Sequence, residues 1–382
     1  MKSLFSYNQV TVDLDALRAN YRFVQQRVGP GVQIMAMVKA DAYGHGMVEA
    51  ALAFAEIGCR YFAVAELFEG VCLRQAGVDG LILVQLGCDS SEIQHLFDYD
   101  LTPVVFDTEA LQVLSRAALA KCRELAIHLK IDSGMGRLGV LPHEVEAYAA
   151  RIAELPGLRL TGLMSHFPLA DDVCSNQTRE QFHQYVSACS RITSDETVLR
   201  HIANSGGLLY FNETCGALVR PGLSLYGYYP DGEQGRQREQ GEQLRPAMRL
   251  ETRVIQVKTV AAGTGISYAH QFVTTRKTRL AVLPIGYANG FLRSLTGQAQ
   301  VLICGQRVPI VGRICMNLCM ADITDCPDVA VGDTVVVMGS QGDQLILADE
   351  IADWMGTISY EVLCLFGNNN ERRYVNRLEE KG

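Results

Sequence analysis

The sequence lacks an excess of basic residues. Its 34 Lys and Arg are outnumbered by 42 Asp and Glu, and the formal net charge at pH 7 is -8. Nucleic acids are bound largely through their phosphates, which require a basic surface on the protein. The charge balance therefore argues against a nucleic-acid partner and favours a small metabolite.

Long hydrophobic runs are also missing. No segment reaches the roughly 20 apolar residues that a membrane span requires, and Met1–Asn8 contains no continuous apolar stretch of the kind that marks a secretory signal. We therefore expect a cytoplasmic protein that does not use a membrane as a partner.

None of the 12 cysteines is spaced as Cys-x-x-Cys. The nearest pair, Cys315 and Cys319, has no neighbouring His or Cys cluster that would complete a zinc site. We expect reduced thiols and no metal centre. The same irregular spacing disfavours a metal-binding regulator built on the cysteine-rich C-terminal part.

What the sequence does contain is a pattern of alternating strands and helices. Within the first 230 residues, eight short apolar runs are candidate strands: Gln33–Val38, Tyr61–Val64, Leu81–Leu86, Thr102–Phe106, Leu125–Ile131, Arg159–Met164, Arg200–Ala203 and Ala217–Leu218. Amphipathic stretches between them are candidate helices: Asp15–Val28, Glu66–Ala76, Ser91–Phe97, Thr108–Cys122, Pro142–Leu155, Gln177–Ile192 and Gly206–Phe211. This alternation predicts a (β/α)8 TIM-type barrel. An open doubly wound sheet is the alternative, weakened because no Gly-x-Gly-x-x-Gly follows the first strand.

The pattern changes after residue 230. Residues 231–243 are almost purely polar, which is typical of a linker or exposed turn. Short β-type runs follow at Met248–Lys258, Thr278–Pro284, Gln300–Ile303, Val308–Val311 and Thr334–Met338, and predict a compact β domain. We expect residues 10–240 to form the barrel, residues 241–382 the β domain, and residues 1–9 a strand that packs with the β domain.

Lys39 carries the strongest local signal of chemistry. It ends the first barrel strand in the run Ala36-Met37-Val38-Lys39-Ala40-Asp41-Ala42-Tyr43-Gly44, and active sites of such barrels lie where the strands end. A partly desolvated amine there has a lowered pKa and reacts with an aldehyde cofactor. On position alone, a lysine that only extends from a strand tip to solvent is the alternative.

This run resembles the cofactor-lysine signature of the alanine racemases, fold-type III enzymes that use pyridoxal phosphate, and the similarity extends through nearly the whole chain. The resemblance implies that Lys39 carries pyridoxal phosphate and that Tyr43 reaches its phosphate. A phosphate site after the last barrel strands fits two segments, Asn204-Ser205-Gly206-Gly207 and Arg220-Pro221-Gly222-Leu223. The implied phosphate ligands are Ser205, Gly222, Leu223 and Tyr360.

The resemblance places Arg220 against the ring nitrogen of the cofactor. Arginine can donate to that nitrogen but cannot leave a proton on it. The ring is then a weak electron sink, which suits racemisation, whereas decarboxylases of this fold are expected to place a carboxylate there. His201 is expected behind Arg220, and His166 between Arg220 and the second base.

Racemisation requires a proton acceptor on each face of the substrate. By the resemblance, Lys39 serves one face and Tyr268, in Gly265-Ile266-Ser267-Tyr268, serves the other from the partner subunit. Arg137, in the loop after the fifth strand, is expected to bind the substrate carboxylate. Lys130 is expected to orient Arg137, which requires either a carbamylated lysine or a bound anion such as chloride.

A last cluster of predicted residues lies in the β domain. The backbone amide of Met316 is expected to help bind the substrate carboxylate, and Tyr287 to form part of the entrance. Asn317 and Asn289 stand where the family usually has Asp, which leaves the substrate range open.

The resulting hypothesis is an alanine racemase-like homodimer with shared active sites that makes D-alanine for peptidoglycan. Three alternatives are a broader amino-acid racemase, a decarboxylase of the same fold, and a non-catalytic pyridoxal-phosphate-binding protein. The last of these is expected to lack the β domain and Tyr268.

Overall fold

The computed structural model describes residues 6–239 and 241–377, and it divides the chain into two units. Unit 2 comprises Leu17–Ala42 and Met47–Leu244. Unit 1 combines the N-terminal segment up to Ala16, the short segment Tyr43–Gly46 and the chain from Arg245 onward. Among the described residues, no helix has both the length and the apolar composition needed to cross a membrane.

Unit 2 contains a parallel sheet of eight strands in the order β8-β7-β6-β5-β4-β3-β2-β9. The strands are β2 (Gln33–Met37), β3 (Tyr61–Val64), β4 (Leu81–Val84), β5 (Thr102–Val105), β6 (Leu125–Lys130), β7 (Leu158–Met164), β8 (Leu199–His201) and β9 (Leu218–Val219). Just beyond the two end strands, the Arg220 amide donates to the Ala203 carbonyl at 2.8 Å. The sheet is therefore a nearly closed barrel, and the predicted fold class is confirmed.

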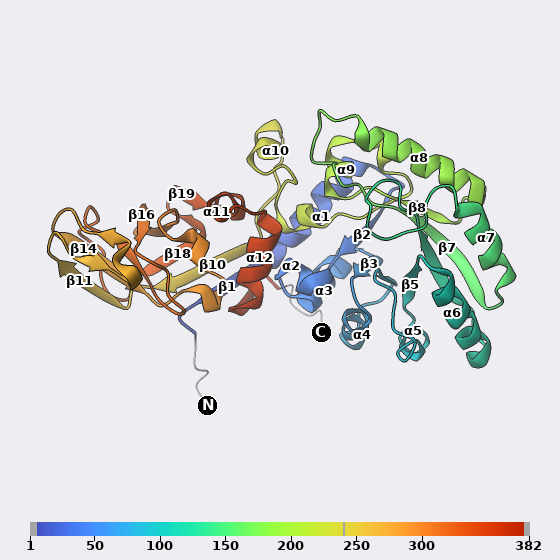
Figure 1. Ribbon diagram of the computed structural model, residues 1–382, viewed down its shortest axis with the longest axis horizontal. Coiled ribbons are helices and arrows are strands. Elements are labelled where there is room, and N and C mark those ends of the chain that lie inside the picture. The colour runs from blue at the N-terminus through green and yellow to red at the C-terminus, as the bar shows by residue number, and fades with distance from the viewer. Residues whose placement is uncertain (1–5, 240, 378–382) are drawn as a thin grey trace. The chain divides into compact units, whose positions relative to one another are not determined.

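Helices on the outside of these strands complete the barrel (Figure 1). They are α1 (Leu14–Val28), α3 (Met47–Glu56), α4 (Leu67–Gln75), α5 (Gln94–Asp98), α6 (Thr108–Lys121), α7 (Val145–Glu154) and α8 (Gln177–Ile192), and the short α9 (Ser205–Tyr210) follows β8. Local sequence explains their starts: the Asp107 side chain accepts from the Ala110 amide at 2.7 Å and caps α6. The polar segment 231–243, predicted as a linker, contains a short helix, α10 (Glu233–Arg238).

Unit 1 is built on a second, ten-stranded sheet, with β19 beside β18 and the other strands in the order β11-β14-β17-β16-β15-β18-β10-β1-β20. Its strands are β1 (Gln9–Asp13), β10 (Met248–Arg253), β11 (Gln256–Val260), β14 (Thr278–Leu283), β15 (Gln300–Ile303), β16 (Gln306–Val311), β17 (Cys319–Asp322), β18 (Thr334–Gln341), β19 (Gln344–Ile346) and β20 (Glu371–Val375). A separate hairpin joins β12 (Gly265–Ile266) to β13 (Phe272–Val273).

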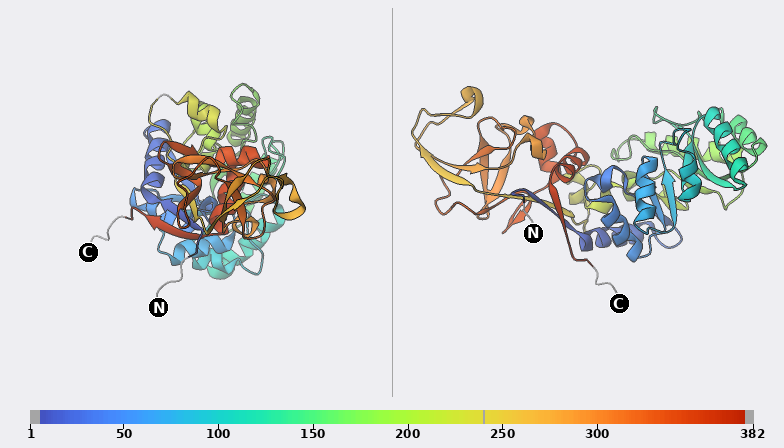
Figure 2. Two further views of the ribbon diagram at one scale, coloured as in Figure 1. Left: turned by 90° about the vertical axis from the view of Figure 1, so that its left-hand side faces the viewer. Right: turned by 90° about the horizontal axis from the view of Figure 1, so that it is seen from below.

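The N-terminal strand lies inside this sheet. Strand β1 pairs antiparallel with β10 and parallel with β20, and in Figure 2 the blue strand runs beside the yellow and red ones. This segment of unit 1 runs to Ala16, and its paired residues are Gln9–Asp13. Residues 1–5 of the strand expected at residues 1–9 lie outside the described part of the chain. Unit 1 also contains two helices, α11 (Ala348–Met355) and α12 (Ser359–Asn368), where the sequence indicated only β structure.

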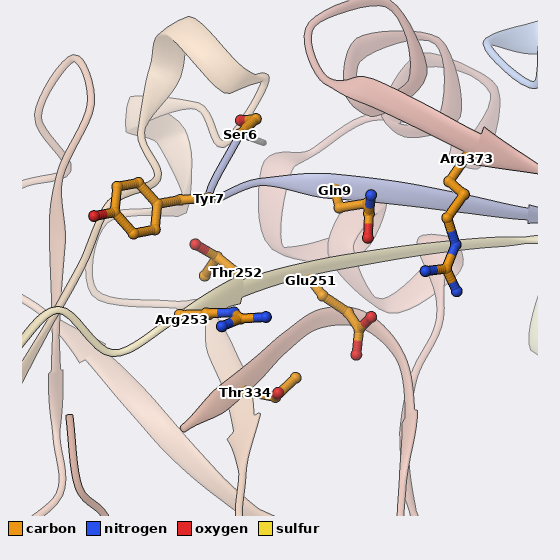
Figure 3. A pocket seen from close by; sticks show the side chains of 8 residues that line it. All are labelled: Ser6, Tyr7, Gln9, Glu251, Thr252, Arg253, Thr334 and Arg373. Atoms are coloured by element: carbon orange, nitrogen blue, oxygen red, sulfur yellow. The ribbon is translucent and has the colours of Figure 1, made fainter. Parts of the chain in front are cut away.

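A polar groove of about 450 Å³ lies over strands β1, β10, β18 and β20 of unit 1 (Figure 3). It is lined by Ser6, Tyr7, Gln9, Glu251, Thr252, Arg253, Thr334 and Arg373. These residues carry charges of both signs, and none of them is a predicted site residue. The predicted chemistry therefore lies elsewhere in the molecule.

Candidate active site

Lys39 lies at the end of the most buried part of strand β2. Ile34 to Met37 are buried, the Val38 amide donates to the Ala63 carbonyl of β3 at 3.0 Å, and Lys39 itself is half-buried. The barrel therefore holds the backbone up to Lys39. This is the position in which the sequence predicted a reactive amine.

Arg220 follows β9 and is the central buried cation of unit 2, with 2% of its surface exposed. Its Nη1 contacts the His201 Nδ1 at 2.8 Å and donates to the His201 carbonyl at 2.7 Å. Its Nη2 contacts the His166 Nδ1 at 3.4 Å. Because a guanidinium can only donate, both imidazoles must accept through Nδ1. Among the described contacts of Arg220 only Nη1 and Nη2 are used, so Nε–H is the group it can offer to a ligand.

The same reasoning extends the chain of hydrogen bonds by one residue. His201 Nε2 lies 3.0 Å from His128 Nδ1, and His201 must carry its proton on Nε2 because its Nδ1 accepts from Arg220. His201 therefore donates to His128, which in turn carries its own proton on Nε2. Both histidines are fully buried.

His128 was not predicted as a site residue. Its signal in the sequence is its spacing from Lys130: the two are two residues apart on β6, so both side chains point to the same face of the strand. Gly162 on β7 provides the space for the His128 ring, because a Cβ at position 162 would lie 2.5 Å from the ring.

Burial and the Arg220 charge keep these imidazoles neutral. Burial, followed by Arg220, lowers the pKa of His128 to about 3 and holds the pKa of His201 and of His166 well below 6.5. Burial also lowers the pKa of Arg220 to about 10, which still leaves it protonated at pH 7. The network therefore consists of one cation and three neutral rings.

Four cationic side chains act electrostatically on His166. Arg220, Lys39, Arg137 and Lys130 all depress its pKa, after the larger effect of burial. Lys130 is buried, and burial followed by Arg137 lowers its pKa to about 8. This lowered pKa raises the fraction of neutral amine, the form that a carbamate requires. Such a concentration of positive charge favours an anionic ligand.

The loop that carries Arg137 is fixed by a single carboxylate. Asp132 Oδ1 accepts from the Gly134 and Gly136 amides at 3.0 Å each, and Oδ2 accepts from the Arg137 amide at 3.0 Å. The loop is thereby held in one conformation after β6. Arg137 itself is exposed.

The segments predicted to bind phosphate are also brought together. Ser205 Oγ accepts from the Gly222 amide at 3.1 Å and from the Ser224 amide at 3.2 Å, and it contacts the Ser224 Oγ at 3.1 Å. Ser205 begins α9, and Leu223 begins a 3-10 helix, η2 (Leu223–Tyr226). The first amides of a helix have no partner within it, so these two helix starts supply hydroxyls and amides of the kind that bind phosphate. The sequence missed Ser224, which looks like an ordinary serine in a turn.

Tyr43 and Tyr360 lie together in unit 1, with ring centroids 5.8 Å apart. Tyr360 is on α12, and Tyr43 belongs to the short segment that joins this unit. Burial, followed by the proximity of Tyr360, raises the pKa of Tyr43 far above its usual value. The Tyr43 hydroxyl is therefore protonated at neutral pH and can act as a donor.

The remaining predicted residues form an exposed cluster in unit 1. Tyr268 is 69% exposed, Met316 56% and Tyr287 38%, and Asn317 is also exposed. The Tyr287 amide donates to the Cys315 carbonyl at 3.1 Å, and the Ala288 amide donates to the Met316 carbonyl at 3.0 Å. These bonds join the segments that carry Tyr287 and Met316.

Ser267, the residue before Tyr268, connects Tyr268 to the same cluster. Ser267 Oγ donates to the Arg313 carbonyl at 2.6 Å and contacts the Cys315 Sγ at 3.4 Å. Asn289, one of the two departures from the usual Asp, accepts from the Gly286 amide at 3.4 Å and so caps the turn after β14. The side-chain amide of Asn289 therefore stabilises this turn.

The structure brings the predicted residues together in two groups. Unit 2 contains Lys39, Lys130, Arg137, His166, His201, Ser205, Arg220, Gly222 and Leu223, and unit 1 contains Tyr43, Tyr268, Tyr287, Met316, Asn317 and Tyr360. In the part of the chain that the structure describes, no cluster of three or more His, Cys, Asp or Glu could hold a metal ion. The chemistry available in unit 2 is that of an amine, several cations, and hydroxyls and amides of the kind that bind phosphate.

Comparison with known proteins shows the family of the chain. Residues 12–230 match the family model of the alanine racemase N-terminal domain, and residues 247–374 match that of the C-terminal domain. The alanine racemase of Halothermothrix orenii is 40% identical over 370 residues, which are 96% of this chain and 96% of the relative. That of Syntrophobacter fumaroxidans is 38% identical over 372 residues, covering 97% of this chain and 98% of the relative.

Two solved structures are also similar. The alanine racemase of Bacillus anthracis with bound L-Ala-P has a TM-score of 0.90 at 33% identity and covers 98% of this chain and 96% of its own. The alanine racemase of Bartonella henselae with covalently bound pyridoxal phosphate has a TM-score of 0.87 at 27% identity, with coverage of 97% and 100%.

Proposed function

Because the chain belongs to the alanine racemase family, we propose that it interconverts L-alanine and D-alanine with pyridoxal phosphate as its cofactor. The observation that carries the proposal is Lys39 at the end of β2, close enough to the buried Arg220–His166 contact to lower the pKa of His166 together with Arg220, Arg137 and Lys130. An amine there can bind an aldehyde, and the surrounding charge accommodates a substrate carboxylate and a phosphate.

The donor set of unit 2 fits pyridoxal phosphate. The Ser205 hydroxyl and the Leu223 amide would hold its phosphate, joined by the Gly222 amide once it turns from Ser205 Oγ, and the Tyr43 and Tyr360 hydroxyls of unit 1 would be further donors. The Arg220 Nε–H would donate to its ring nitrogen. When bound, the cofactor withdraws electrons from the substrate Cα and makes the Cα proton acidic.

The protein residues determine what happens to that proton. Arg220 remains protonated and has no acceptor, so it cannot leave a proton on the ring nitrogen. Arg220 would therefore keep the electron sink weak, which favours rapid return of the Cα proton. Arg137 and the Met316 amide would hold the substrate carboxylate and prevent the substrate from turning. Lys39 would exchange the proton on one face and Tyr268 of the partner subunit on the other.

The shared site requires a homodimer. Tyr268, Tyr287 and Met316 lie on an exposed cluster of unit 1, where they are accessible to a second copy of the chain. A two-fold symmetric dimer would build two equivalent sites in this way. His166 would then lie between Arg220 and the phenol, and Tyr287 would line the entrance.

We place this activity in the cytoplasm, where D-alanine would supply peptidoglycan synthesis. All the cysteines that the structure describes are free thiols, which is the usual state in a reducing compartment.

The test uses the two proposed bases. We expect Lys39→Ala to lose the yellow absorbance of the bound cofactor, because the amine that holds the aldehyde is gone. We expect Tyr268→Phe to keep that absorbance while racemisation of alanine falls by about 10²-fold or more, the usual contribution of a general base. The measurements are absorbance spectra and the rate of interconversion of L- and D-alanine.

Tyr99→Phe, a change at a tyrosine whose hydroxyl accepts an exposed hydrogen bond from Gln75 Nε2 at 3.3 Å, is the control and should behave as wild type. Full activity in Tyr268→Phe would contradict the second-base assignment. Cofactor absorbance retained in Lys39→Ala would contradict the assignment of the cofactor lysine.

A further inference from the structure

The backbone after Lys39 is held in an unfavourable conformation. Ala40 (φ 52°, ψ 49°), Asp41 (φ 53°, ψ 46°) and Ala42 (φ 54°, ψ 50°) are left-handed, and Tyr43 follows with φ 54°. Left-handed conformations cost L-residues free energy, and residues other than Gly rarely adopt them in succession. Specific contacts must therefore hold this turn in place.

Glu69 makes such a contact at the start of the turn. Its side chain is on the first turn of α4, and the residue is 5% exposed. Glu69 Oε1 accepts from the Ala40 amide at 2.7 Å, across 29 residues of sequence. Glu69 Oε2 accepts from the Ala65 amide at 2.7 Å and the Glu66 amide at 3.0 Å. A buried carboxylate satisfied by three amides is a strong acceptor.

Capping of α4 explains only one of these three bonds. A Glu at the third helical position of a capping box returns to the amide of the capping residue, and the Oε2 contact to Glu66 does this. The Oε1 contact to Ala40 has no part in capping. It connects α4 to the peptide group immediately after Lys39.

That peptide group determines how Lys39 leaves the strand. The Ala40 N–H is in the same rigid plane as the Lys39 carbonyl, so fixing one fixes the other. The bond to Glu69 therefore sets the ψ angle of Lys39. The far end of the turn is held separately, since the Asp41 Oδ1 accepts from the Met47 amide at 2.7 Å where α3 begins.

We propose that Glu69 is a positioning residue for the cofactor lysine, because its buried carboxylate holds the Lys39–Ala40 peptide group in the orientation that the left-handed turn requires. This inference rests on the proposed function, in which Lys39 carries the cofactor. Its structural part, the anchoring of the turn, is testable without the cofactor.

Glu69→Gln separates the two uses of the carboxylate. An amide side chain has one acceptor oxygen and one NH2 group. In the variant, the Ala65 and Glu66 amides both donate to the single side-chain oxygen at position 69. The NH2 group then faces the Ala40 N–H, and two donors cannot form a hydrogen bond. In cofactor-free protein, we expect hydrogen exchange of residues 39–43 to accelerate at least about tenfold, while residues 67–75 of α4 keep their protection.

Two further variants sharpen the test. Asp107→Asn changes another helix-capping carboxylate of the barrel and should leave the exchange of residues 39–43 unchanged. Ala40→Gly combined with Glu69→Gln should recover part of the loss, because Gly adopts φ 52° without a steric penalty. With added pyridoxal phosphate, the rate of covalent attachment at Lys39 should fall in Glu69→Gln and partly recover in the double variant.

Equal exchange of residues 39–43 in Glu69→Gln and wild type would overturn the proposal, and so would an equal acceleration throughout α4. If Glu69→Gln does not fold, the double variant must fold, and failure of both would assign Glu69 to helix capping alone. Absence of covalent attachment in the wild type would contradict the proposed function and leave the exchange result standing.

Discussion

Arg220 shows how a single residue fixes the chemistry of its neighbours. Because it can only donate hydrogen bonds, its contact with His201 determines the position of the proton on that ring, and the bond from His201 to His128 then determines the next. The three neutral histidines and the one cation are thus set by a single guanidinium. Protonation of His201 or His128 would place a second positive charge close to Arg220.

This network predicts a pH dependence of stability. The folded pKa of His128 is about 3, below the value of about 6.5 expected for the unfolded chain. The unfolded state therefore binds more protons below pH 6.5, so the free energy of unfolding falls as pH decreases from 6.5 towards 3. His166 and His201 act in the same direction. Each group contributes a slope of up to about 1.4 kcal/mol per pH unit.

His128→Gln removes the contribution of His128 to the pH dependence of the free energy of unfolding. Between pH 6 and pH 4, we expect the free energy of unfolding of this variant to fall less steeply than that of wild type, by about 1.4 kcal/mol per pH unit. Urea unfolding at several pH values measures both slopes. Identical slopes would mean that His128 titrates normally in the folded protein.

At the residue level, the sequence predicted those side chains whose signal is a strand end or a distinctive neighbour. Lys39, Arg137, Arg220 and Ser205 belong to this class. His128, Ser224 and Glu69 were missed, because a histidine in an apolar strand or a Glu early in a helix has the same local pattern with or without a functional contact. Their partners depend on which strands become neighbours in the barrel.

At the level of elements, the predicted barrel strands agree with the observed ones to within two residues at most ends. Helix α3 was missed because Met47–Glu56 is largely apolar, with Met47, Ala50, Ala51, Ala53 and Phe54 all buried, and so shows little polar face. The left-handed turn after Lys39 could not be predicted either. Its residues at 40–42 are Ala, Asp and Ala, with no Gly to indicate positive φ.

Strand β7 provides a prediction at this scale. A methyl group at Gly162 would lie 2.5 Å from His128 ring atoms, and neither the strand backbone nor the buried ring can move freely. We expect Gly162→Ala to lower the free energy of unfolding by about 1–3 kcal/mol, the usual cost of overpacking a core, in urea denaturation.

The matched control is Gly241→Ala. Gly241 is exposed, and the nearest atom to an added Cβ is the Glu239 Oε1 at 4.0 Å. This variant should unfold like wild type. An equal effect of the two substitutions would show that the ring of His128 does not need the space beside Gly162.

At the level of the whole molecule, the sequence predicted a barrel and a second domain rich in β structure, and the family of the chain confirms both. One short segment that belongs to the other unit could not be predicted. Tyr43–Gly46 belongs to unit 1 although it is surrounded in sequence by barrel residues. The local composition of this segment does not indicate its position, because that position depends on close packing of Gly44 against the backbone of Leu363 and Cys364.

A mixing experiment tests the shared site. Lys39→Ala and Tyr268→Phe subunits are each expected to be nearly inactive alone. If Tyr268 acts across the dimer, each mixed dimer contains one site with both native residues, and random mixing should restore about a quarter of wild-type activity. The racemisation rate after denaturation and joint refolding measures this recovery. No recovery would show that both bases come from one chain.

The location of β1 constrains how the polypeptide matures during translation. Domains tend to fold in the order in which they leave the ribosome. Strand β1 (Gln9–Asp13), however, can pair on its two edges only after Met248–Arg253 and Glu371–Val375 have been synthesised. The barrel sequence is synthesised during that interval. Premature termination before the last strand would leave an open edge able to recruit a neighbouring nascent chain.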